Sequence, residues 1–389
     1  MVNTIVVVSF SDLSLDPRVN RQIRFLADRC RVIAVGYADP AIPGVEFMQV
    51  SRGRKNLVEK ANAAIHLLTG RYEEYYWNQA RVRMALELLR DVDADVIIAN
   101  DVDALPLALR VARGAKVIFD AHEYSPRQFE NRWTFRLFFQ RYLTYLCHTY
   151  IPRVDGMMTV GEEIARQYER DTSVRPVVVT NAPDYEDLRP GPVAPQGRIR
   201  LVHHGSASPD RKIENMIRAM DYLGEGYELD LLLVGGRPCY RRRLERLAAA
   251  RPYVRLLEPV PMRELPRFLN QYDMGVYLLE PRSFNMRFAL PNKIFEFIQA
   301  RLAVAVGPSP EMARLVQQYG VGIVAREFSP ESIAESIRAC SREDIALFKR
   351  RAHEAASVLS ADANRELVLA LVTGLLSGER GATTRSLHA

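Results

Sequence analysis

Short apolar runs alternate along the chain with longer segments that carry an apolar residue at every third or fourth position. In the first half, this helical pattern is clearest over Arg18–Arg29 and Trp77–Leu89. The apolar runs are rich in Val and Ile and span Ile5–Val8, Val32–Val35, Val96–Ala99, Val117–Phe119, Gly156–Val160 and Val177–Thr180. Strands that are apolar along their whole length are buried on both faces, and intervening helices indicate parallel pairing. The first half is therefore predicted to be a doubly wound α/β domain.

The regular alternation stops at Asp184–Arg198, a segment with three prolines, two glycines and no periodic pattern. It restarts with a predicted strand at Leu201–His203 and continues to a strand at Gly322–Val324. We therefore predict an N-terminal Rossmann-like domain over residues 1–184, a linker over 185–198 and a second Rossmann-like domain over 199–360. We expect the two domains to face each other across a cleft, because ligands of open α/β sheets lie beyond the carboxyl ends of the strands.

The C-terminal region contains one more predicted helix, over residues 361–376. Its leucines at 367, 371 and 375 share one face and need a partner surface, which we expect the N-terminal domain to provide. Residues 377–389 show no periodic pattern and are predicted to be a disordered tail.

The composition of the chain argues against several classes of protein. The 389 residues are 48% hydrophobic, which is enough to bury two cores, and the net charge of +6 is spread along the chain rather than gathered in a stripe. The spread charge disfavours a polynucleotide partner. The four cysteines lie far apart without a CxxC pair, which argues against a zinc site or a disulfide framework. No charged leader precedes the first strand and no stretch reaches the roughly 18 apolar residues of a membrane span, so a cytoplasmic protein is expected.

A basic and aromatic segment over residues 128–153 leaves one question of location open. Its apolar residues at 135, 138, 139, 142 and 146 form one helical stripe, with arginines at 132, 136 and 141 among them. Such a stripe is more often part of a core. Peripheral contact with the inner face of a membrane is the alternative.

The stretch from Leu278 to Val306 contains the first group of candidate site residues. A polar loop follows a predicted strand, and a helix begins at Pro291 or Asn292, with Lys293 and Glu296 in its first turns. Unsatisfied backbone N–H groups and a lysine at a helix start favour binding of phosphate. An ordinary loop with a surface Lys and Glu is the alternative.

A second group lies at residues 203–212, between a predicted strand and a helix. Gly205 allows a ligand to approach the backbone, Arg211 can bind two oxygens of a diphosphate, and Lys212 adds a point charge. A generic helix start is again the alternative. His203 and His204 are expected to point to opposite faces of the strand end, one inward and one outward.

Taken in order along the chain, these segments resemble the nucleotide-sugar half of retaining GT-B glycosyltransferases of family four. The resemblance depends on the HG loop with its basic pair, on Val234-Gly235-Gly236, on LPNKIFEF at 290–297 and on SPEM at 309–312. In the first half, the segments DPRV (16–19), NDVDALP (100–106) and DAHE (120–123) resemble acceptor-domain segments of bacterial members. The similarity covers about residues 1–330, and the LPNK sequence is typical of one branch of the family.

For the second half, the resemblance implies a site for a nucleotide diphosphate sugar. Glu296 matches the second glutamate of the E-x7-E motif, which binds the ribose hydroxyls, whereas position 288 is Phe where the family has the first glutamate. Arg211 and Lys212 match the diphosphate clamp, with a register that is uncertain by one position. The remaining expected donor-binding residues are Lys293, Asn292, Gly205, Gly235 and Asn285.

For the first half, the resemblance implies an acceptor site. His122 follows the predicted strand VIFDA and is expected to lie near the reacting sugar, as a catalytic residue together with Arg211 and Lys212. The expected acceptor-binding residues are Asp101, Glu123, Asp16 and Arg18. Asp101-Val102-Asp103 also imitates the DxD motif of metal-dependent enzymes. We prefer a helix cap there and expect no metal, because the basic clamp can neutralise the diphosphate.

The resulting hypothesis is a retaining, metal-independent glycosyltransferase with a UDP-sugar as co-substrate and no other cofactor. The acceptor is expected to be a sugar or another hydroxyl compound. Two alternatives remain open. A nucleotide-sugar epimerase on the same fold would need the same clamp but no acceptor, and a non-catalytic nucleotide-binding subunit would be compatible with Phe288.

Overall fold

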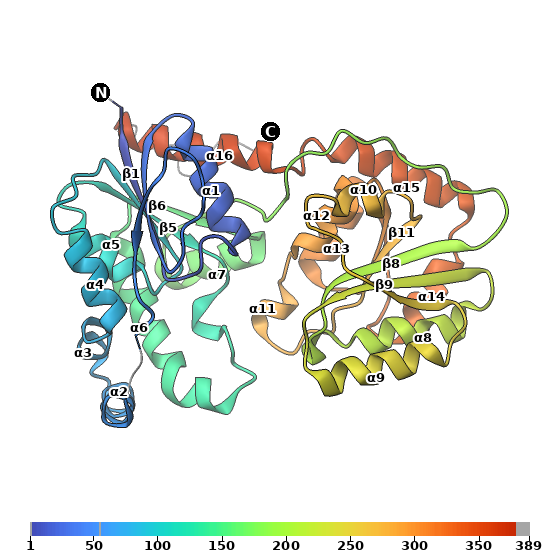
Figure 1. Cartoon of the computed structure of the whole chain (residues 1–389), viewed down its shortest axis with the longest axis horizontal. Coiled ribbons are helices and arrows are strands. Elements are labelled where there is room, and N and C mark those ends of the chain that lie inside the picture. The colour runs from blue at the N-terminus through green and yellow to red at the C-terminus, as the bar shows by residue number, and fades with distance from the viewer. Residues whose placement is uncertain (1, 54–55, 379–389) are drawn as a thin grey trace. The chain divides into compact units, whose positions relative to one another are not determined.

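The computed structural model describes residues 2–53 and 56–378, which form two compact units (Figure 1). The first unit contains the chain up to Thr180, the short segment Ser283–Asn285 and the C-terminal residues from Asn364. The second unit contains Asn181–Arg282 and Met286–Ala363. The predicted tail over residues 377–389 falls almost wholly outside the described residues.

The first unit is built on a sheet of parallel strands in the order β3-β2-β1-β4-β5-β6-β7. This order reverses direction between β1 and β4, so the sheet is doubly wound, as the apolar runs predict. The short strand β3 has a half-exposed pattern and was not predicted, because it lacks a continuous apolar run. The strands are β1 (Thr4–Ser9), β2 (Arg31–Gly36), β3 (Glu46–Gln49), β4 (Val96–Asn100), β5 (Lys116–Ala121), β6 (Gly156–Thr159) and β7 (Val177–Val178).

Helices cover this sheet, and their starts follow from local chemistry. The Asp16 side chain accepts a hydrogen bond from the Val19 backbone N–H, and Pro17 occupies the first turn of α1, where its missing N–H costs nothing. The predicted helix over Trp77–Leu89 corresponds to α4, which begins only at Ala80 because the chain turns at Asn78, after α3 ends at Trp77. The helices are α1 (Pro17–Ala27), α2 (Leu57–Leu68), α3 (Tyr72–Trp77), α4 (Ala80–Leu88), α5 (Leu105–Val111), α6 (Gln140–Tyr150), α7 (Glu162–Thr172) and α16 (Ala361–Leu376), with shorter turns at Ser125–Arg127, Phe135–Phe139 and Ile151–Arg153.

One face of the first sheet is covered by α1 and by the last helix of the chain. Ile5 and Val7 of β1 share a buried cluster with Ile23 of α1 and with Val368 and Leu371 of α16. The C-terminal helix therefore contributes to the core of a sheet whose first strand begins at residue 4.

The second unit is built on another doubly wound parallel sheet, in the order β10-β9-β8-β11-β12-β13, with the reversal between β8 and β11. The strands are β8 (Ile199–Ser206), β9 (Tyr227–Val234), β10 (Val254–Leu257), β11 (Met274–Tyr277), β12 (Ala303–Val306) and β13 (Gly322–Val324). The helices are α8 (Ile213–Leu223), α9 (Pro238–Ala249), α10 (Leu265–Leu269), α11 (Phe284–Arg287), α12 (Asn292–Gln299), α13 (Pro310–Tyr319), α14 (Pro330–Arg338) and α15 (Arg342–Ala355), with a short turn at Pro209–Arg211.

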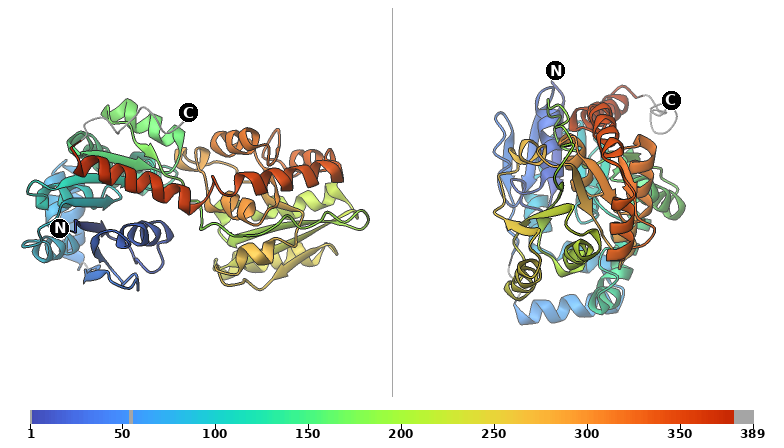
Figure 2. Two further views of the ribbon diagram at one scale, coloured as in Figure 1. Left: turned by 90° about the horizontal axis from the view of Figure 1, so that it is seen from above. Right: turned by 90° about the vertical axis from the view of Figure 1, so that its right-hand side faces the viewer.

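Both faces of the second sheet are buried, and helices lie on either side of it in the left view of Figure 2. Adjacent residues of β8 enter different clusters: Leu201 packs with α8, α9 and α14, whereas Val202 packs with α10, α12 and α13. This explains why the strands of the second half are apolar along their whole length.

Residues 185–198 have no helix or strand and lie along the second unit. Arg301, which is fully buried, donates to the backbone carbonyl of Glu186, and Asn270 donates to that of Arg189. Arg342 donates to the carbonyls of Ala194 and Gly197. Side chains of the second unit thus fix this proline-containing segment.

The aromatic stripe over residues 128–153 is largely buried. Phe135, Tyr142 and Leu146 are each at most 5% exposed, Phe138 is half-buried, and Phe139 is 38% exposed. Most of the stripe is therefore core, and contact with a membrane surface stays a prediction. Within the described ranges, no helix combines the length and the apolar character needed to cross a bilayer.

Candidate functional site

In the second unit, the expected donor residues meet at the carboxyl end of β8, where the sheet reverses direction. The φ angle of Gly205 is +121°, which side chains disfavour. A Cβ atom built on Gly205 would lie 2.4 Å from both Cε and Nζ of Lys293 and 3.8 Å from Nη1 of Arg211. The glycine therefore leaves room for the Lys293 ammonium group, with the Arg211 guanidinium beside it.

Lys293 belongs to the first turn of α12 and is only 8% exposed. Burial, the nearby Arg211 charge and a smaller opposing effect of Glu296 set the pKa of Lys293 at about 8, well below its usual range. Its Nζ atom also lies 5.6 Å from the centre of the Tyr277 ring. A buried ammonium group and a half-buried guanidinium group, adjacent at the end of a parallel strand, form a site that an anion would stabilise.

The pKa of Lys293 predicts how nucleotide affinity depends on pH. A diphosphate binds best to the protonated amine, and above pH 8 the free protein must take up a proton to bind. We expect the affinity for UDP to fall about tenfold between pH 7 and pH 9 and the proton uptake to rise toward one, while the phosphate, with a second pKa of about 6, stays ionised. Calorimetric titration in two buffers of different ionisation enthalpy measures both quantities.

The variant Lys293→Met provides the control for this prediction. It should bind UDP weakly at every pH and show neither the slope nor the proton uptake. A wild-type affinity that stays constant from pH 7 to pH 9.5 would contradict the contact between Lys293 and the diphosphate.

Lys212 is placed differently from its neighbour Arg211. It has a positive φ of 44° at the start of α8, and its Nζ atom donates to the carboxylate of Glu280. Because this acidic partner neutralises its charge, Lys212 is less available to an anion than Arg211 or Lys293. The structure thus distinguishes two cations that the sequence could not rank.

Glu296, on α12, is 6% exposed, and its Oε2 atom lies 3.2 Å from Nε2 of His204. Burial and the charge of Lys293 hold the pKa of His204 well below its usual range. The same causes set the pKa of His203 at about 3. The expectation that one histidine points outward is wrong, because helices cover both faces of the sheet and both side chains are buried.

The other expected donor residues of the second unit surround this point. Gly235 has a φ of +60° and open space where a side chain would be, so its backbone is accessible to a ligand. Gly236 lies against Ala207, whose carbonyl oxygen would be 2.4 Å from an added Cβ. Asn292 is the first residue of α12 and is half-buried. Phe288 is also half-buried and lies under the Arg287 guanidinium.

In the first unit, two of the expected acceptor residues have internal partners. Asp16 caps α1 and also accepts a hydrogen bond from the Ser11 hydroxyl. Arg18 makes two hydrogen bonds to the buried Asp120, at 2.6 and 2.9 Å. Although burial alone would raise it, the Arg18 guanidinium lowers the pKa of Asp120. Both residues hold α1 to the loops at the end of the sheet.

His122 follows β5 and lies among polar groups at the carboxyl ends of β4 and β5. Its Nε2 atom is 3.1 Å from Oδ1 of Asn100, and its Nδ1 atom is 3.5 Å from Oδ2 of Asp101. Asp101 has a positive φ of 62° and accepts from the His122 backbone N–H. The strained backbone and the shared carboxylate orient an imidazole that is 19% exposed.

Glu123 and Asn285 are brought together in the first unit, to which Ser283–Asn285 belongs. The Asn285 amide donates to Oε2 of Glu123 and to the Tyr124 carbonyl, and its oxygen accepts from the Tyr124 N–H. Burial raises the pKa of Glu123 to about 7, against the opposing effect of a hydrogen bond from Gln128. Asn285, expected on the donor side, thus orients the Glu123 carboxyl of the first unit, a role that sequence alone did not indicate.

Asp103, the second aspartate of the DxD imitation, forms an ion pair with Arg81 at 3.0 Å. In the described part of the chain, no group of three His, Cys, Asp or Glu side chains has the arrangement of a metal site. Other residues that sequence reasoning missed are Tyr277 and Glu280. Neither of them belongs to a short motif of its own, and only the tertiary structure brings them beside the donor residues.

Residues 198–343 match the family model described as glycosyl transferases group 1. No curated protein matches the chain. Among solved structures, sucrose-phosphate synthase from Thermosynechococcus elongatus is 13% identical, with a TM-score of 0.72 over 97% of this chain and 100% of the other. HepE from Anabaena, in complex with UDP and glucose, is also 13% identical, with a TM-score of 0.69 over 96% and 100%.

A third similar structure is an α,α-trehalose-phosphate synthase (UDP-forming) from Burkholderia vietnamiensis, 13% identical, with a TM-score of 0.68 over 96% of this chain and 100% of the other. The likeness to these structures shows that the chain has the GT-B fold. The match of the second unit to a glycosyltransferase family model identifies the protein as a glycosyltransferase enzyme.

Proposed function

We propose that the protein transfers a sugar from a UDP-sugar to an acceptor hydroxyl, with retention of configuration and without a metal ion. The observation that carries this proposal is a pair of adjacent cations, the buried Lys293 and the half-buried Arg211, beside Gly205 in the unit that matches the glycosyltransferase model. The complex of HepE with UDP and glucose supports UDP as the nucleotide.

The proposed chemistry follows from where charge develops. The bond between the anomeric carbon and the diphosphate breaks, and negative charge accumulates on the leaving oxygen, where Arg211 and Lys293 stabilise it. The acceptor oxygen bonds to the anomeric carbon on the same face, and its proton passes to the leaving phosphate oxygen. UDP and the glycosylated acceptor are the products. In this scheme His122 contacts the donor sugar, and Glu123 and Asp101 orient the acceptor.

We assign Glu296 to the ribose hydroxyls of the nucleotide. Its buried carboxylate can accept two hydrogen bonds from a vicinal diol, and charge-assisted bonds of this kind contribute about 1.5–3 kcal/mol. We therefore expect Glu296→Ala to weaken UDP binding about 10- to 150-fold. Calorimetric titration with UDP and with 2′-deoxy-UDP tests this assignment directly, because the variant should bind the two ligands with equal affinity.

Glu214→Ala is the matched control, since Glu214 is another buried carboxylate of the same unit but is bound to the Tyr240 hydroxyl. That variant should keep the preference for UDP over 2′-deoxy-UDP. If Glu296→Ala retains this preference in a folded protein, the ribose assignment is wrong.

A broader titration tests the function itself. UDP, GDP, ADP and dTDP are each titrated with EDTA and again with magnesium, and the UDP-sugar is then incubated with and without acceptors. Tight binding of UDP in EDTA and a product that requires an acceptor are the expected results. Conversion of the donor without an acceptor would identify an epimerase, and nucleotide binding without turnover would identify a non-catalytic subunit.

A further inference from the structure

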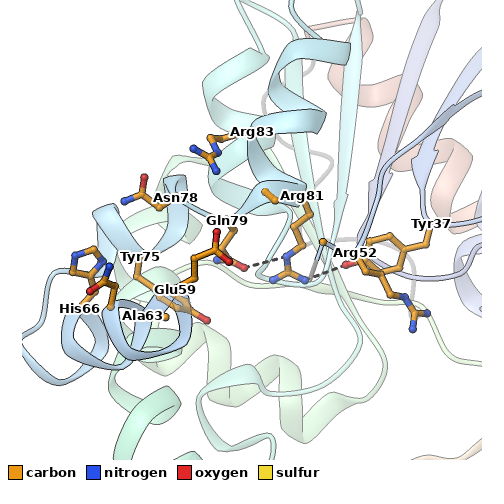
Figure 3. A pocket seen from close by; sticks show the side chains of 13 residues that line it. Tyr37, Arg52, Glu59, Ala63, His66, Tyr75, Asn78, Gln79, Arg81 and Arg83 are labelled. Atoms are coloured by element: carbon orange, nitrogen blue, oxygen red, sulfur yellow. Dashed lines mark hydrogen bonds between the residues drawn. The ribbon is translucent and has the colours of Figure 1, made fainter. Parts of the chain in front are cut away.

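Two cavities of the first unit share a wall of three residues. The larger, of about 450 Å³, lies between α2 and the ends of β2 and β3, and Tyr37, Arg52 and Arg83 line it (Figure 3). The smaller, of about 290 Å³, is lined by Asp101 and by aromatic residues of the 128–143 segment. Both are lined by Tyr75, Gln79 and Arg81. Together the two cavities run from the loop that contains Asp101 to the ends of β2 and β3. Asp101 is the residue that orients His122.

Gln79 lies in the shared wall with an unsatisfied donor. Arg81 donates through Nε to Oε1 of Gln79 at 3.1 Å, as Figure 3 shows. Because a guanidinium group only donates, the atom that faces it must be the oxygen, which leaves the NH₂ group elsewhere. Gln79 is 6% exposed, and within the described residues its Nε2 atom has no hydrogen-bond partner. A buried amide in this state needs an oxygen partner, which an ordered water or a ligand supplies.

Tyr142 contributes a second unsatisfied donor to the smaller cavity. Its ring packs edge-on against Tyr75, with centroids 4.9 Å apart, and the residue is 2% exposed. Its hydroxyl is buried and has no hydrogen-bond partner in the part of the chain that the structure describes. Two unsatisfied donors, one in the shared wall and one in the adjoining cavity, indicate a ligand rich in oxygen.

The charges around the larger cavity favour an anionic group on this ligand. The Arg81 charge is balanced by Asp103 and lies over the Phe10 ring. Arg52 lies over the Tyr37 ring, and neither Arg52 nor Arg83 has an ion pair among the described residues. Glu59 is the acidic residue in this lining. The larger, outer cavity thus has an excess of positive side chains. The smaller, inner cavity is largely aromatic, and its charged residues are Asp101, Asp103 and Arg81.

We propose that the joined cavities bind an acceptor saccharide that carries a carboxylate or phosphate group. The Gln79 amide and the Tyr142 hydroxyl donate to sugar oxygens, and Arg52 and Arg83 select the anionic substituent. Asp101, which lines the inner cavity, lies at the end nearest His122. This inference rests on the proposed function, because it specifies the acceptor of the same reaction.

Three probes that differ at one carbon test the charge selection: glucose, glucuronic acid and glucose 6-phosphate. Ligand-observed NMR on the full chain saturated with UDP measures their affinities at low salt. We expect at least one anionic probe to bind at least fivefold more tightly than glucose. Stronger binding of glucuronic acid would identify a carboxylate, and stronger binding of glucose 6-phosphate a phosphate.

The double variant Arg52→Gln, Arg83→Gln should remove the preference for the anionic probes. Arg110→Gln is the matched control, because Arg110 is an exposed arginine of the same unit that lines neither cavity. It should keep the preference. Equal binding of all three probes to the wild-type protein, or binding of none of them, would overturn the anionic acceptor.

Gln79→Met and Tyr142→Phe test the two donors. Tyr142→Phe removes a hydroxyl that is unsatisfied in the free protein, so its melting temperature should stay the same or rise. Gln79→Met removes the unsatisfied NH₂ group together with the oxygen that accepts from Arg81, so its melting temperature should fall slightly. In both variants probe affinity should fall about three- to tenfold. Tyr76→Phe is the control: the Tyr76 hydroxyl donates to the Asp103 carbonyl and accepts from the Leu107 N–H. Its loss should lower the melting temperature.

The outcomes separate this inference from the proposed function. Wild-type probe affinity in both Gln79→Met and Tyr142→Phe would overturn the assignment of the cavities. UDP binding is measured in the same samples, and its absence from the wild-type protein would contradict the donor site instead. UDP binding with no effect of any variant in the first unit would overturn the acceptor assignment alone.

Discussion

Replacement of Arg211 by methionine is expected to lower turnover at saturating donor by about 10²- to 10³-fold, the range observed when one group that stabilises developing negative charge is removed. The guanidinium lies beside Gly205 and the Lys293 ammonium, where the proposed diphosphate leaves. Methionine keeps much of the side-chain volume, so the loss reports on charge. The rate of UDP release in the presence of acceptor measures it.

Lys212→Met is the matched control for this prediction. The two residues are adjacent, but the Lys212 amine is bound to the Glu280 carboxylate. We expect its turnover to fall less than tenfold. A large loss in Lys212→Met together with a small loss in Arg211→Met would show that Lys212, not Arg211, is the residue of the clamp.

Replacement of Gly205 by alanine is expected to weaken UDP binding on the order of 100-fold or more. Alanine is strained at a φ of +121°, and its Cβ would overlap the end of the Lys293 side chain at 2.4 Å. Lys293 must then leave its place beside Arg211, so the diphosphate loses a charge-assisted contact of about 1.5–3 kcal/mol in addition to the strain. Calorimetric titration with UDP measures the change.

Gly224→Ala separates backbone strain from the displacement of Lys293. Gly224 ends α8 with a φ of +76°, and an added Cβ would meet nothing within 4 Å. This variant should lose some stability and keep its affinity for UDP. Equal affinity losses in the two variants would attribute the effect to general destabilisation.

The two predictions have a common physical origin. Burial of Lys293 and, after it, repulsion from the neighbouring Arg211 keep the pKa of Lys293 low before an anion binds. The fold maintains this unfavourable arrangement through the packing of α12, whose Ile294, Phe295 and Phe297 are fully buried. A diphosphate would relieve this repulsion. Because both positive groups are already in place in the free protein, binding of the diphosphate does not have to bring them together.

The apolar runs were sufficient to predict two doubly wound parallel sheets, because a strand buried on both faces must be apolar throughout. The elements that escaped prediction are those with a weaker pattern, such as the half-exposed β3 and the break at Asn78 between α3 and α4. Local spacing could not reveal that β13 needs Gly322, where an added Cβ would lie 1.8 Å from the Val304 carbonyl.

The sequence by itself determined the fold class and the short motifs from which the candidate residues come, since periodicity and composition act over a few residues. Only the tertiary structure decided which cation is available: Glu280, distant in sequence, binds Lys212, and Gly205 leaves room for Lys293 beside Arg211. The tertiary structure also left the Gln79 NH₂ group and the Tyr142 hydroxyl without hydrogen-bond partners among the described residues, in adjoining cavities. Burial and pairing depend on residues far apart in the chain, so these properties exist only once the sheets have formed.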